Sequence, residues 1–489
     1  MENLETPKPE VKPEIQVSFL ERVFSSIGFR LGVTLILVLF LLIPLNLVQD
    51  LIQERSQRER SVSAEISSKW GGAQVFSGPI VGVPFMRQEK VQTEDTKGKT
   101  KTEIVWVRDY VFLTANKTQI TSTIKPEYLK RGIYQSVVYN ADLQASGEFA
   151  ELDLSKENIR KEDLLWQEAK LFIGLSDLKG LKGNPSLKWG NDNLSFQVDQ
   201  DEVKLFEQVL SVPVDLSNHS TKGTFAITAE LRGTKTLTVF PTAAETAIKI
   251  NGAWSNPSFD GGFLPENREV GKDKFAADWH VMGFNRSFPQ QWSGGNKLMY
   301  ALEARDVNYY AEYREPAAAS SSVLASEQDM VQVSFLESVN NYQKTTRVAK
   351  YGALVILLTF TSLFFTEILK KQRVHFVQYI LIGCAMVLFY ALLLAIGEHL
   401  GFNWSYFVAA LATIGLIVSF VYGITKDKKT SLIFAGILSV FYVFVFALMQ
   451  LQDYALIAGA IGVFIILAVL MRLSIRVNWN QLDGKEGRS

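Results

Sequence analysis

Hydrophobic residues in the last third of the chain form long runs that are separated by short polar breaks. Each run is close to the ~20 residues that a helix needs to cross a ~30 Å hydrocarbon layer. None contains Lys or Arg, whose charge would cost ~2.5–3.5 kcal/mol or more at the membrane centre. The runs are apolar on all sides, unlike the striped helices of soluble proteins. The pattern therefore predicts five transmembrane helices within residues 349–473: Tyr351–Phe365, Val377–Ile396, Trp404–Ile424, Ser431–Leu448 and Tyr454–Met471.

A sixth apolar run, Leu31–Val48, lies near the N-terminus. A cleavable signal peptide would have an apolar region of ~7–15 residues before a small-residue cleavage site. This run is longer, and no A-x-A pattern follows it, so an uncleaved membrane anchor is favoured over a signal peptide. Apolar positions at helical spacing in Val17–Phe29 predict an interfacial helix, which gives an anchor segment of residues 17–50. Residues 1–16, polar and rich in proline, predict a disordered tail.

Residues 51–348 contain no run that is long and apolar enough to span a membrane. Thr, Val, Phe and Trp alternate instead with polar residues, and Gly, Pro and Asn interrupt them, which is typical of strands. This pattern predicts a β-rich domain of two antiparallel sheets. The clearest predicted strands are Ile104–Val107, Thr224–Thr228 and Thr236–Phe240. Two segments are expected to be helical, Glu162–Leu171 and Asp201–Val209.

Composition narrows the class of protein further. The 50 basic and 50 acidic residues cancel, which removes the electrostatic argument for nucleic-acid binding. A single cysteine, Cys384, lies inside an apolar run, so the β-rich domain has no intramolecular disulfide. That domain must therefore depend on a hydrophobic core, for which about 300 residues suffice.

The short loops between the apolar runs predict the orientation. Two of them are basic and two contain no Lys or Arg: Lys370–His375 and Lys426–Lys429, against Gly397–Asn403 and Gln450–Asp453. Basic short loops mark the cytoplasmic side. Both termini, including residues 474–489, are then cytoplasmic, and the β-rich domain is extracytoplasmic. Arg347 and Lys350 depart from this rule, but the other loops outweigh them.

Polar residues at the ends of the predicted spans are the candidate functional residues, because ionisable groups in membrane segments are costly and often functional. Glu367 lies near Lys370 and Lys371, where an interfacial ion pair is the simpler interpretation. The other candidates close two spans at the outer side, where they are either water-exposed helix ends or a polar docking or proton-sensitive coupling site. They are Glu398, His399, Gln450 and Asp453.

No catalytic, cofactor-binding or metal-binding residues are predicted. The chain contains no G-x-S-x-G, H-E-x-x-H or phosphate-binding G-x-x-x-x-G-K-[ST] pattern. The four histidines are far apart, whereas a zinc site needs three or four converging ligands. Trp254, Trp279 and Trp292 are interpreted as core rather than as an exposed platform for a peptide or sugar. Small residues in the spans predict close helix packing: Gly383, Cys384, Gly415, Gly436, Gly459 and Gly462.

Short motifs along nearly the whole chain resemble the CreD family of bacterial inner-membrane proteins. They begin in the first span, continue through the β-rich domain and end in the apolar region. Those that carry the resemblance include Ile43-Pro44-Leu45, Glu54-Arg55, Trp70-Gly71, Gly78-Pro79-Ile80, Arg131-Gly132-Ile133-Tyr134, Gly147-Glu148-Phe149, Trp254-Ser255-Asn256-Pro257, Asn285-Arg286, Tyr342-Gln343-Lys344, Arg373-Val374-His375 and Glu398-His399. The proline-bearing tail and residues 317–322 look like local additions.

The resemblance implies an inner-membrane location and a role in envelope homeostasis, linked with a two-component regulatory system and with tolerance to colicins or β-lactams. It implies no enzymatic activity. We therefore expect a non-catalytic scaffold that contacts the bilayer and an envelope protein or cell-wall component. A transporter or channel built from the C-terminal bundle is the alternative, and an enzyme has the least support.

Overall fold

The computed structural model describes residues 27–94, 100–155, 159–200, 203–294, 299, 329–335, 341–370, 374–451 and 454–475. The chain divides into two compact units. The first combines Met1–Arg58 with Val339–Ser489, and the second is Glu59–Ser338. The expected disordered tail, most of the expected interfacial helix and residues 317–322 lie outside the described residues.

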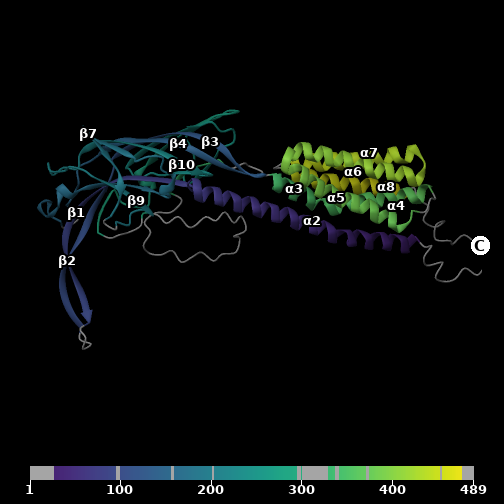
Figure 1. Cartoon of the computed structure of the whole chain (residues 1–489), viewed down its shortest axis with the longest axis horizontal. Coiled ribbons are helices and arrows are strands. Elements are labelled where there is room, and N and C mark those ends of the chain that lie inside the picture. Colours follow the sequence, from purple (N-terminus) through teal and green to yellow (C-terminus); the bar gives the residue numbers. More distant parts are fainter. Residues whose placement is uncertain are drawn as a thin grey trace, which may run out of the picture. The chain divides into compact units, whose positions relative to one another are not determined.

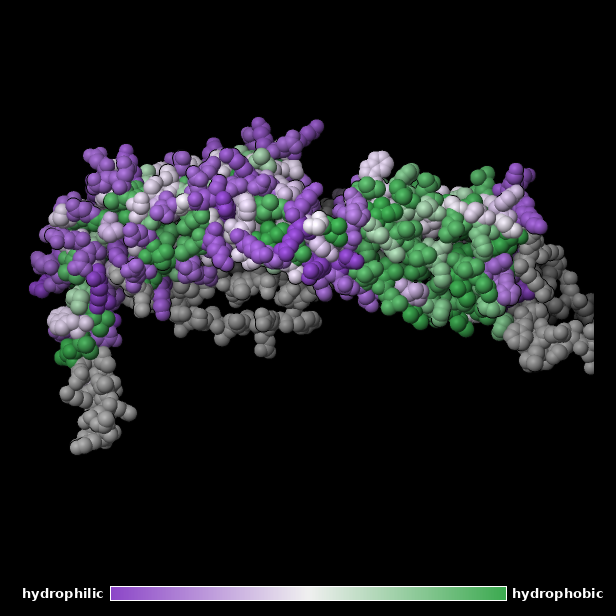
Figure 2. Space-filling view, viewed as in Figure 1, coloured by the Kyte–Doolittle hydropathy of each residue, from purple (hydrophilic) through white to green (hydrophobic). Residues whose placement is uncertain are grey.

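The described part of the first unit is helical, and every predicted span coincides with a helix, apart from the first residue of two of them, Tyr351 and Tyr454 (Figure 1). Short connections such as the single residue Gly401, at φ 75°, join consecutive helices, so α5, α6 and α7 are neighbours. Figure 2 shows the visible surface of this unit as predominantly hydrophobic, as expected of helices that face lipid. The helices are α2 (Ile27–Trp70, whose last residues belong to the second unit), α3 (Asn341–Lys350), α4 (Gly352–Lys370), α5 (Phe376–Leu400), α6 (Phe402–Thr425), α7 (Lys428–Gln450) and α8 (Ala455–Ile475).

The number of membrane-crossing helices differs from the six that were predicted. In the described part of the chain, four helices are long and apolar enough to cross a membrane, namely α2, α5, α6 and α7. A fifth span results if α3 and α4, which meet at 41°, are counted together. The apolar stretch described in α8, Ile457–Arg472, is shorter than a full span. The described residues therefore contain four or five helices that can cross a membrane, and the predicted number of six is not confirmed.

The second unit is built from two β-sheets. Among the described residues, one sheet has nine strands: β13 (Ser258–Gly261), β17 (Val331–Ser334), β11 (Thr236–Phe240), β1 (Gln74–Glu94), β5 (Lys170–Leu175), β9 (Gln208–Pro213) and β8 (Gln197–Val198) in this order, with β2 (Thr100–Thr114) on β1 and β16 (Gln291–Ser293) on β2. The other sheet has eight strands in the order β14 (Asn267–Val270), β15 (Phe275–Met282), β12 (Glu245–Gly252), β3 (Lys117–Arg131), β4 (Tyr134–Phe149), β10 (Gly223–Thr234), β6 (Ser186–Trp189) and β7 (Asp192–Ser195).

Two strand pairs are parallel, which corrects the expectation of purely antiparallel sheets. They are β1 with β11 and β3 with β12, whereas the other described pairs are antiparallel. The chain changes sheet between β10 and β11 at Lys235, which has a φ of 63°. Because β11 then joins the other sheet beside β1, its direction is set by this crossover and not by a hairpin. Local alternation of residues carries no information about such a crossover.

The main hydrophobic core draws buried side chains from both sheets, such as Val81 and Leu171 from one and Ile120 and Leu143 from the other. Trp279 is buried there, and its Nε1 donates to the Phe263 carbonyl at 3.1 Å. Trp292 is buried in a second cluster, while Trp254 is partly buried against the main core. This placement agrees with the interpretation of these tryptophans as core residues.

Both predicted helical patches of this unit are wrong. Glu162–Leu171 contains two short 3₁₀ turns, η1 (Lys161–Asp163) and η2 (Trp166–Glu168), and then enters β5; η3 (Leu178–Gly180) and η4 (Gly283–Asn285) are further turns. The described part of Asp201–Val209 is not helical and leads into β9. Its apolar side chains, including Leu205 and Phe206, are buried in the second cluster. Tertiary burial therefore overrides the weak helical propensity of these segments.

Tyr139→Phe is expected to lower the free energy of unfolding of the β-rich unit by about 1 kcal/mol. The Tyr139 hydroxyl is buried and donates to the Thr236 carbonyl at 2.7 Å, which ties β4 to the start of β11. Burial raises the pKa of Tyr139 well above its ordinary value. The contribution of the Tyr139 hydroxyl to the free energy of unfolding is therefore present below about pH 10 and is lost as the pH rises further, because Tyr139 ionises at a lower pH in the unfolded chain than in the folded one. Thermal unfolding of both proteins across this pH range measures the difference, and equal stabilities would contradict the assignment.

Candidate functional site

Helix α2 contributes one arginine to each of two polar clusters in the helical unit. Arg30 pairs with Glu367 of α4, and Arg55 lies near Glu398 of α5. At ~1.5 Å per residue, the helix from Arg30 to Arg55 is about 37 Å long. A hydrocarbon layer is ~30 Å thick, so the two arginines are spaced for its two boundaries. The polar clusters therefore mark the two ends of the membrane-embedded part.

The first cluster surrounds Glu367, which is 8% exposed. Arg30 Nη1 lies 3.2 Å from Glu367 Oε1, and the Tyr379 hydroxyl of α5 donates to Glu367 Oε2 at 3.2 Å. Both carboxylate oxygens thus have a partner, which a buried charge requires. The sequence predicts an ion pair with Lys370 or Lys371, whose side chains lie outside the described residues. The described cation is instead Arg30, from the opposite end of the sequence.

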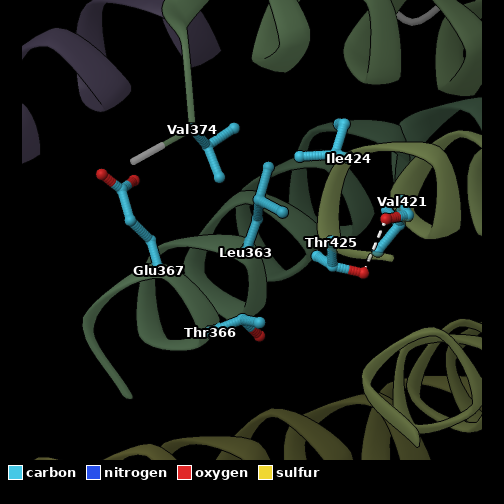
Figure 3. A pocket seen from close by; sticks show the side chains of 7 residues that line it. All are labelled: Leu363, Thr366, Glu367, Val374, Val421, Ile424 and Thr425. Carbon is cyan, nitrogen blue, oxygen red and sulfur yellow. Dashed lines mark hydrogen bonds between the residues drawn. The ribbon is translucent and has the colours of Figure 1, made fainter. Parts of the chain in front are cut away.

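A small, partly enclosed recess lies beside Glu367 (Figure 3). The side chains of Leu363 and Val374 point toward the same space, while Glu367 lies at its edge. The Thr425 hydroxyl donates to the Val421 carbonyl at 2.9 Å, so it is satisfied within its own helix. The recess therefore has an apolar floor and one charged rim. Its lining residues are Leu363, Thr366, Glu367, Val374, Val421, Ile424 and Thr425.

The second cluster surrounds Glu398 near the end of α5. The Tyr342 hydroxyl of α3 donates to Glu398 Oε1 at 3.2 Å, and Arg55 Nε lies 3.9 Å from the same oxygen. Nearby in the same helices, Gln49 Nε2 donates to the Ala349 carbonyl at 3.2 Å, which joins α2 to α3 directly. Glu398 thus contacts the two helices that flank the β-rich unit in the sequence: α2, which leads into that unit, and α3, which follows it.

The remaining candidates from the sequence do not join this cluster. Gln450 Nε2 donates to Asn403 Oδ1 at 3.3 Å, which links the end of α7 to the start of α6. His399 is exposed. Asp453 lies outside the described residues. Among the described residues the contacts of Glu398 and of Gln450 are with different partners, and those of Glu398 add Tyr342 and Arg55, which the loop pattern did not single out.

Between the two clusters the bundle interior is aromatic. Phe389, Tyr406 and Tyr442 are packed together, and the Tyr406 hydroxyl donates to the Tyr442 carbonyl at 2.7 Å. This layer links α5, α6 and α7 through ring contacts. Its hydroxyl–carbonyl bond satisfies a polar group where water is absent, as packing within a membrane requires.

The prediction that small residues pack closely is correct at two positions and wrong at four. A Cβ atom on Gly383 would overlap Leu41 of α2, and one on Gly462 would overlap Phe444 of α7. The remaining four small residues face outward: a Cβ at three of the glycines would meet nothing within 4 Å, and Cys384 is exposed. Hydropathy cannot show which side of an apolar helix faces its neighbours. These outward-facing residues are Cys384, Gly415, Gly436 and Gly459.

The described residues include no group of three or more His, Cys, Asp or Glu side chains that could hold a metal ion. In the β-rich unit, the guanidinium of Arg286 donates to the Thr242 carbonyl, the Gln290 side chain and the Thr114 hydroxyl. Burial lowers the pKa of Arg286 to about 10. These contacts tie three loops and strands together and leave the guanidinium inside the domain, which is a structural arrangement.

Comparison with known proteins agrees with this architecture. A family model described as "Inner membrane protein CreD" matches residues 26–480. The chain is also 28% identical to the inner membrane protein CreD of Escherichia coli (strain K12) over 433 residues, which cover 87% of this chain and 88% of that protein. Since the match spans the apolar helices and the β-rich unit together, the chain belongs to the CreD family and is a multi-pass inner membrane protein.

Proposed function

We propose that this protein is a non-catalytic envelope protein whose β-rich unit binds another envelope protein or a cell-wall component. The helical unit anchors it and transmits or resists load on that unit. The observation that carries this proposal is the Glu398 cluster, where one carboxylate contacts both α2 and α3. The chain passes between the two units at residues 58–59 in α2 and at residues 338–339 just before α3, so both connections lie next to helices that Glu398 contacts.

The proposal places residues 51–348 in the periplasm and both termini in the cytoplasm. Basic residues in the loops before α5 and before α7 support this orientation, because short basic loops stay on the cytoplasmic side. In this arrangement the Glu398 cluster lies at the periplasmic boundary and the Glu367 cluster at the cytoplasmic one.

Charge at Glu398 supports a coupling role more than a stabilising one. The carboxylate is 14% exposed and Arg55 is 44% exposed, and their closest approach is 3.9 Å. A partly hydrated pair of this kind contributes ~0–1 kcal/mol to stability. Such a weak contact can open and close at small cost, which a rigid buried pair cannot do. Glu398 is therefore placed to report movement of α2 or α3.

Glu398→Gln is expected to reduce tolerance to colicins or β-lactams to the level of a strain that lacks the protein, while the amount of protein stays normal. The amide keeps the size of the side chain but removes its attraction for Arg55. His399→Gln is the matched control, because it changes the next, exposed residue of the same helix. Tolerance assays with quantitative immunoblots make the comparison. Unchanged tolerance in Glu398→Gln would rule out the coupling role.

A further inference from the structure

The strands β1 and β2 continue beyond the rest of their sheet and form a two-stranded arm, Met86–Glu94 with Thr100–Arg108, in antiparallel register. Figure 1 shows this arm projecting from the β-rich unit. The pairing of β5 with β1 ends at Gly82, and the pairing of β16 with β2 ends at Val111. Among the described residues, no third strand therefore pairs with the arm. A two-stranded hairpin alone is only marginally stable in water, so a partner for the arm is expected.

The two edges of the arm differ in chemistry. On β1, Arg87 forms ion pairs, one of them with Glu89 at 3.2 Å. Charged residues of this kind protect a sheet edge from pairing with another chain. On β2 the exposed residues are apolar: Ile104 is 61%, Val105 44% and Trp106 60% exposed. Figure 2 shows hydrophobic surface on the arm. The edge of β2 is therefore the one that lacks this protection.

Backbone groups of β2 are directed toward this edge at every second residue. Where β16 occupies the same edge, the Thr114 amide donates to the segment that contains β16 and the Tyr110 carbonyl accepts from it, each at 3.0 Å. The even-numbered residues of β2 thus face this edge, and the register with β1 is regular along the whole strand. In the arm, the amides and carbonyls of Thr102, Ile104 and Trp106 are therefore placed to pair with a further strand.

We propose that this further strand is β2 of a second copy of the chain, paired antiparallel about a twofold axis at Val105. In this register Ile104 lies opposite Trp106 of the second copy, and Trp106 lies opposite Ile104. Both residues direct their backbone groups to the shared edge, so each such pair exchanges two hydrogen bonds. An aromatic residue opposite a β-branched one also stabilises a sheet. The pairing makes one continuous sheet of β1 and β2 from both copies.

The charges of β2 are complementary to each other in this register. Lys101 is set opposite Asp109 of the second copy, a pair of opposite charge. Moving the axis by one residue to Trp106 would set Glu103 opposite Asp109, and like charges in opposite positions destabilise a sheet. Moving the axis one residue the other way removes both the opposite-charge pair and the aromatic pair. The sequence therefore favours the axis at Val105.

Lipid and an unrelated protein strand match the arm less well. The connection between the two strands, residues 95–99, contains Asp95, Lys97 and Lys99, and an arm that entered lipid would carry these charges with it. An unrelated strand could satisfy the backbone groups of the edge. It would not account for the complementarity of β2 to its own sequence.

A cysteine at the proposed axis tests the pairing directly. Val105→Cys, in a chain that also carries Cys384→Ser, sets a thiol opposite its own counterpart in the second copy. Residues opposite each other in such a non-hydrogen-bonded pair have Cβ atoms close enough for a disulfide. Glu89→Cys is the matched control, because Glu89 lies opposite Val105 on β1 and therefore at the other edge of the arm.

Membranes that contain the full-length chain are oxidised with copper phenanthroline, and the linked dimer is measured by nonreducing electrophoresis. Val105→Cys is expected to give about tenfold more linked dimer than Glu89→Cys, because only the first has its thiols within disulfide range. Equal linking of both variants would show random collision. A link from position 105 to a protein of different mass would show another partner, and no link would show no pairing; each of these results overturns the proposal.

Trp106→Lys tests the same edge without a cross-link. Purified full-length protein in detergent is expected to dimerise as its concentration rises, and Trp106→Lys to weaken the dimer about tenfold, because it removes both pairs with Ile104. Trp106 is exposed, so the variant keeps its fold, which thermal unfolding verifies. Gln88→Lys is the control, since Gln88 is exposed and lies opposite Trp106 on β1. Native mass spectrometry measures the dimer. Equal dimerisation of the two variants, or a wild-type protein that stays monomeric, would contradict the proposal.

Discussion

Gly383→Leu is expected to separate α2 from the C-terminal bundle and to destabilise the helical unit by about 3 kcal/mol or more. A Cβ on Gly383 would already lie 3.0 Å from Leu41 Cδ2 and would overlap Cδ1, and Leu41 is 1% exposed. Neither backbone can withdraw without opening the close contact between α2 and α5. Unfolding of the purified protein in a series of sodium dodecyl sulfate concentrations measures the change.

Gly415→Leu is the matched control for this substitution, because a Cβ there meets nothing within 4 Å. It should change the free energy of unfolding by no more than about 0.5 kcal/mol. Adding Leu41→Ala to Gly383→Leu should recover part of the lost free energy of unfolding, since the effects of substitutions at two residues in contact are not additive. Equal effects of Gly383→Leu and Gly415→Leu would contradict the packing of α2 against α5.

Arg30→Leu is expected to destabilise the helical unit by about 2–3 kcal/mol. The substitution leaves the buried Glu367 carboxylate with Tyr379 as its remaining described partner. Removing one member of a fully buried pair costs ~3–5 kcal/mol, and the partial exposure of Arg30 reduces this value. Detergent unfolding of the purified variant measures the loss.

The double variant Arg30→Leu with Glu367→Leu should recover most of that stability, because it leaves no unpaired charge. Arg55→Leu is the control at the other end of α2, where the looser pair contributes at most about 1 kcal/mol. A double variant that is no more stable than Arg30→Leu would show that the ion pair is not the source of the effect.

The sequence was sufficient to locate the apolar helices and the β-rich region. Hydrophobic length alone marks helices such as α5 and α6, because a lipid-facing helix must be apolar on every side. The sequence pattern wrongly predicted a helix for Glu162–Leu171, where burial of Trp166 and Leu171 against the sheets decides the conformation. The parallel pairing of β1 with β11 was also beyond reach, since register between distant strands leaves no local pattern.

The candidate site was only partly predictable. Glu367 and Glu398 stand out because carboxylates are rare in apolar runs, and both have cationic or hydroxyl partners in the structure. Their partners Arg30 and Tyr342 are more than 50 residues away in sequence, on helices whose rotation hydropathy cannot fix. The expected cluster of Glu398 with Gln450 and Asp453 stays a prediction, since Asp453 lies outside the described residues and the contact described for Gln450 is with Asn403.

Two arginines of α2, Arg30 and Arg55, connect this helix to the C-terminal bundle. They bind carboxylates at opposite ends of the bundle, so α2 is held at both membrane boundaries before it continues toward the β-rich unit. Stability is expected to reside mainly at the Glu367 end, where the pair is more buried. The more exposed Glu398 end is left for coupling.

Cysteine labelling tests the proposed orientation, on which the envelope role depends. Cys384→Ser gives a cysteine-free chain, since the sequence has one cysteine. Lys188→Cys in the β-rich unit and Lys428→Cys at the start of α7 are then introduced separately at exposed positions. A membrane-impermeant maleimide added to intact spheroplasts should label the cysteine at position 188, and should label the one at 428 only after lysis. Labelling of position 428 but not 188 in intact spheroplasts would contradict the account.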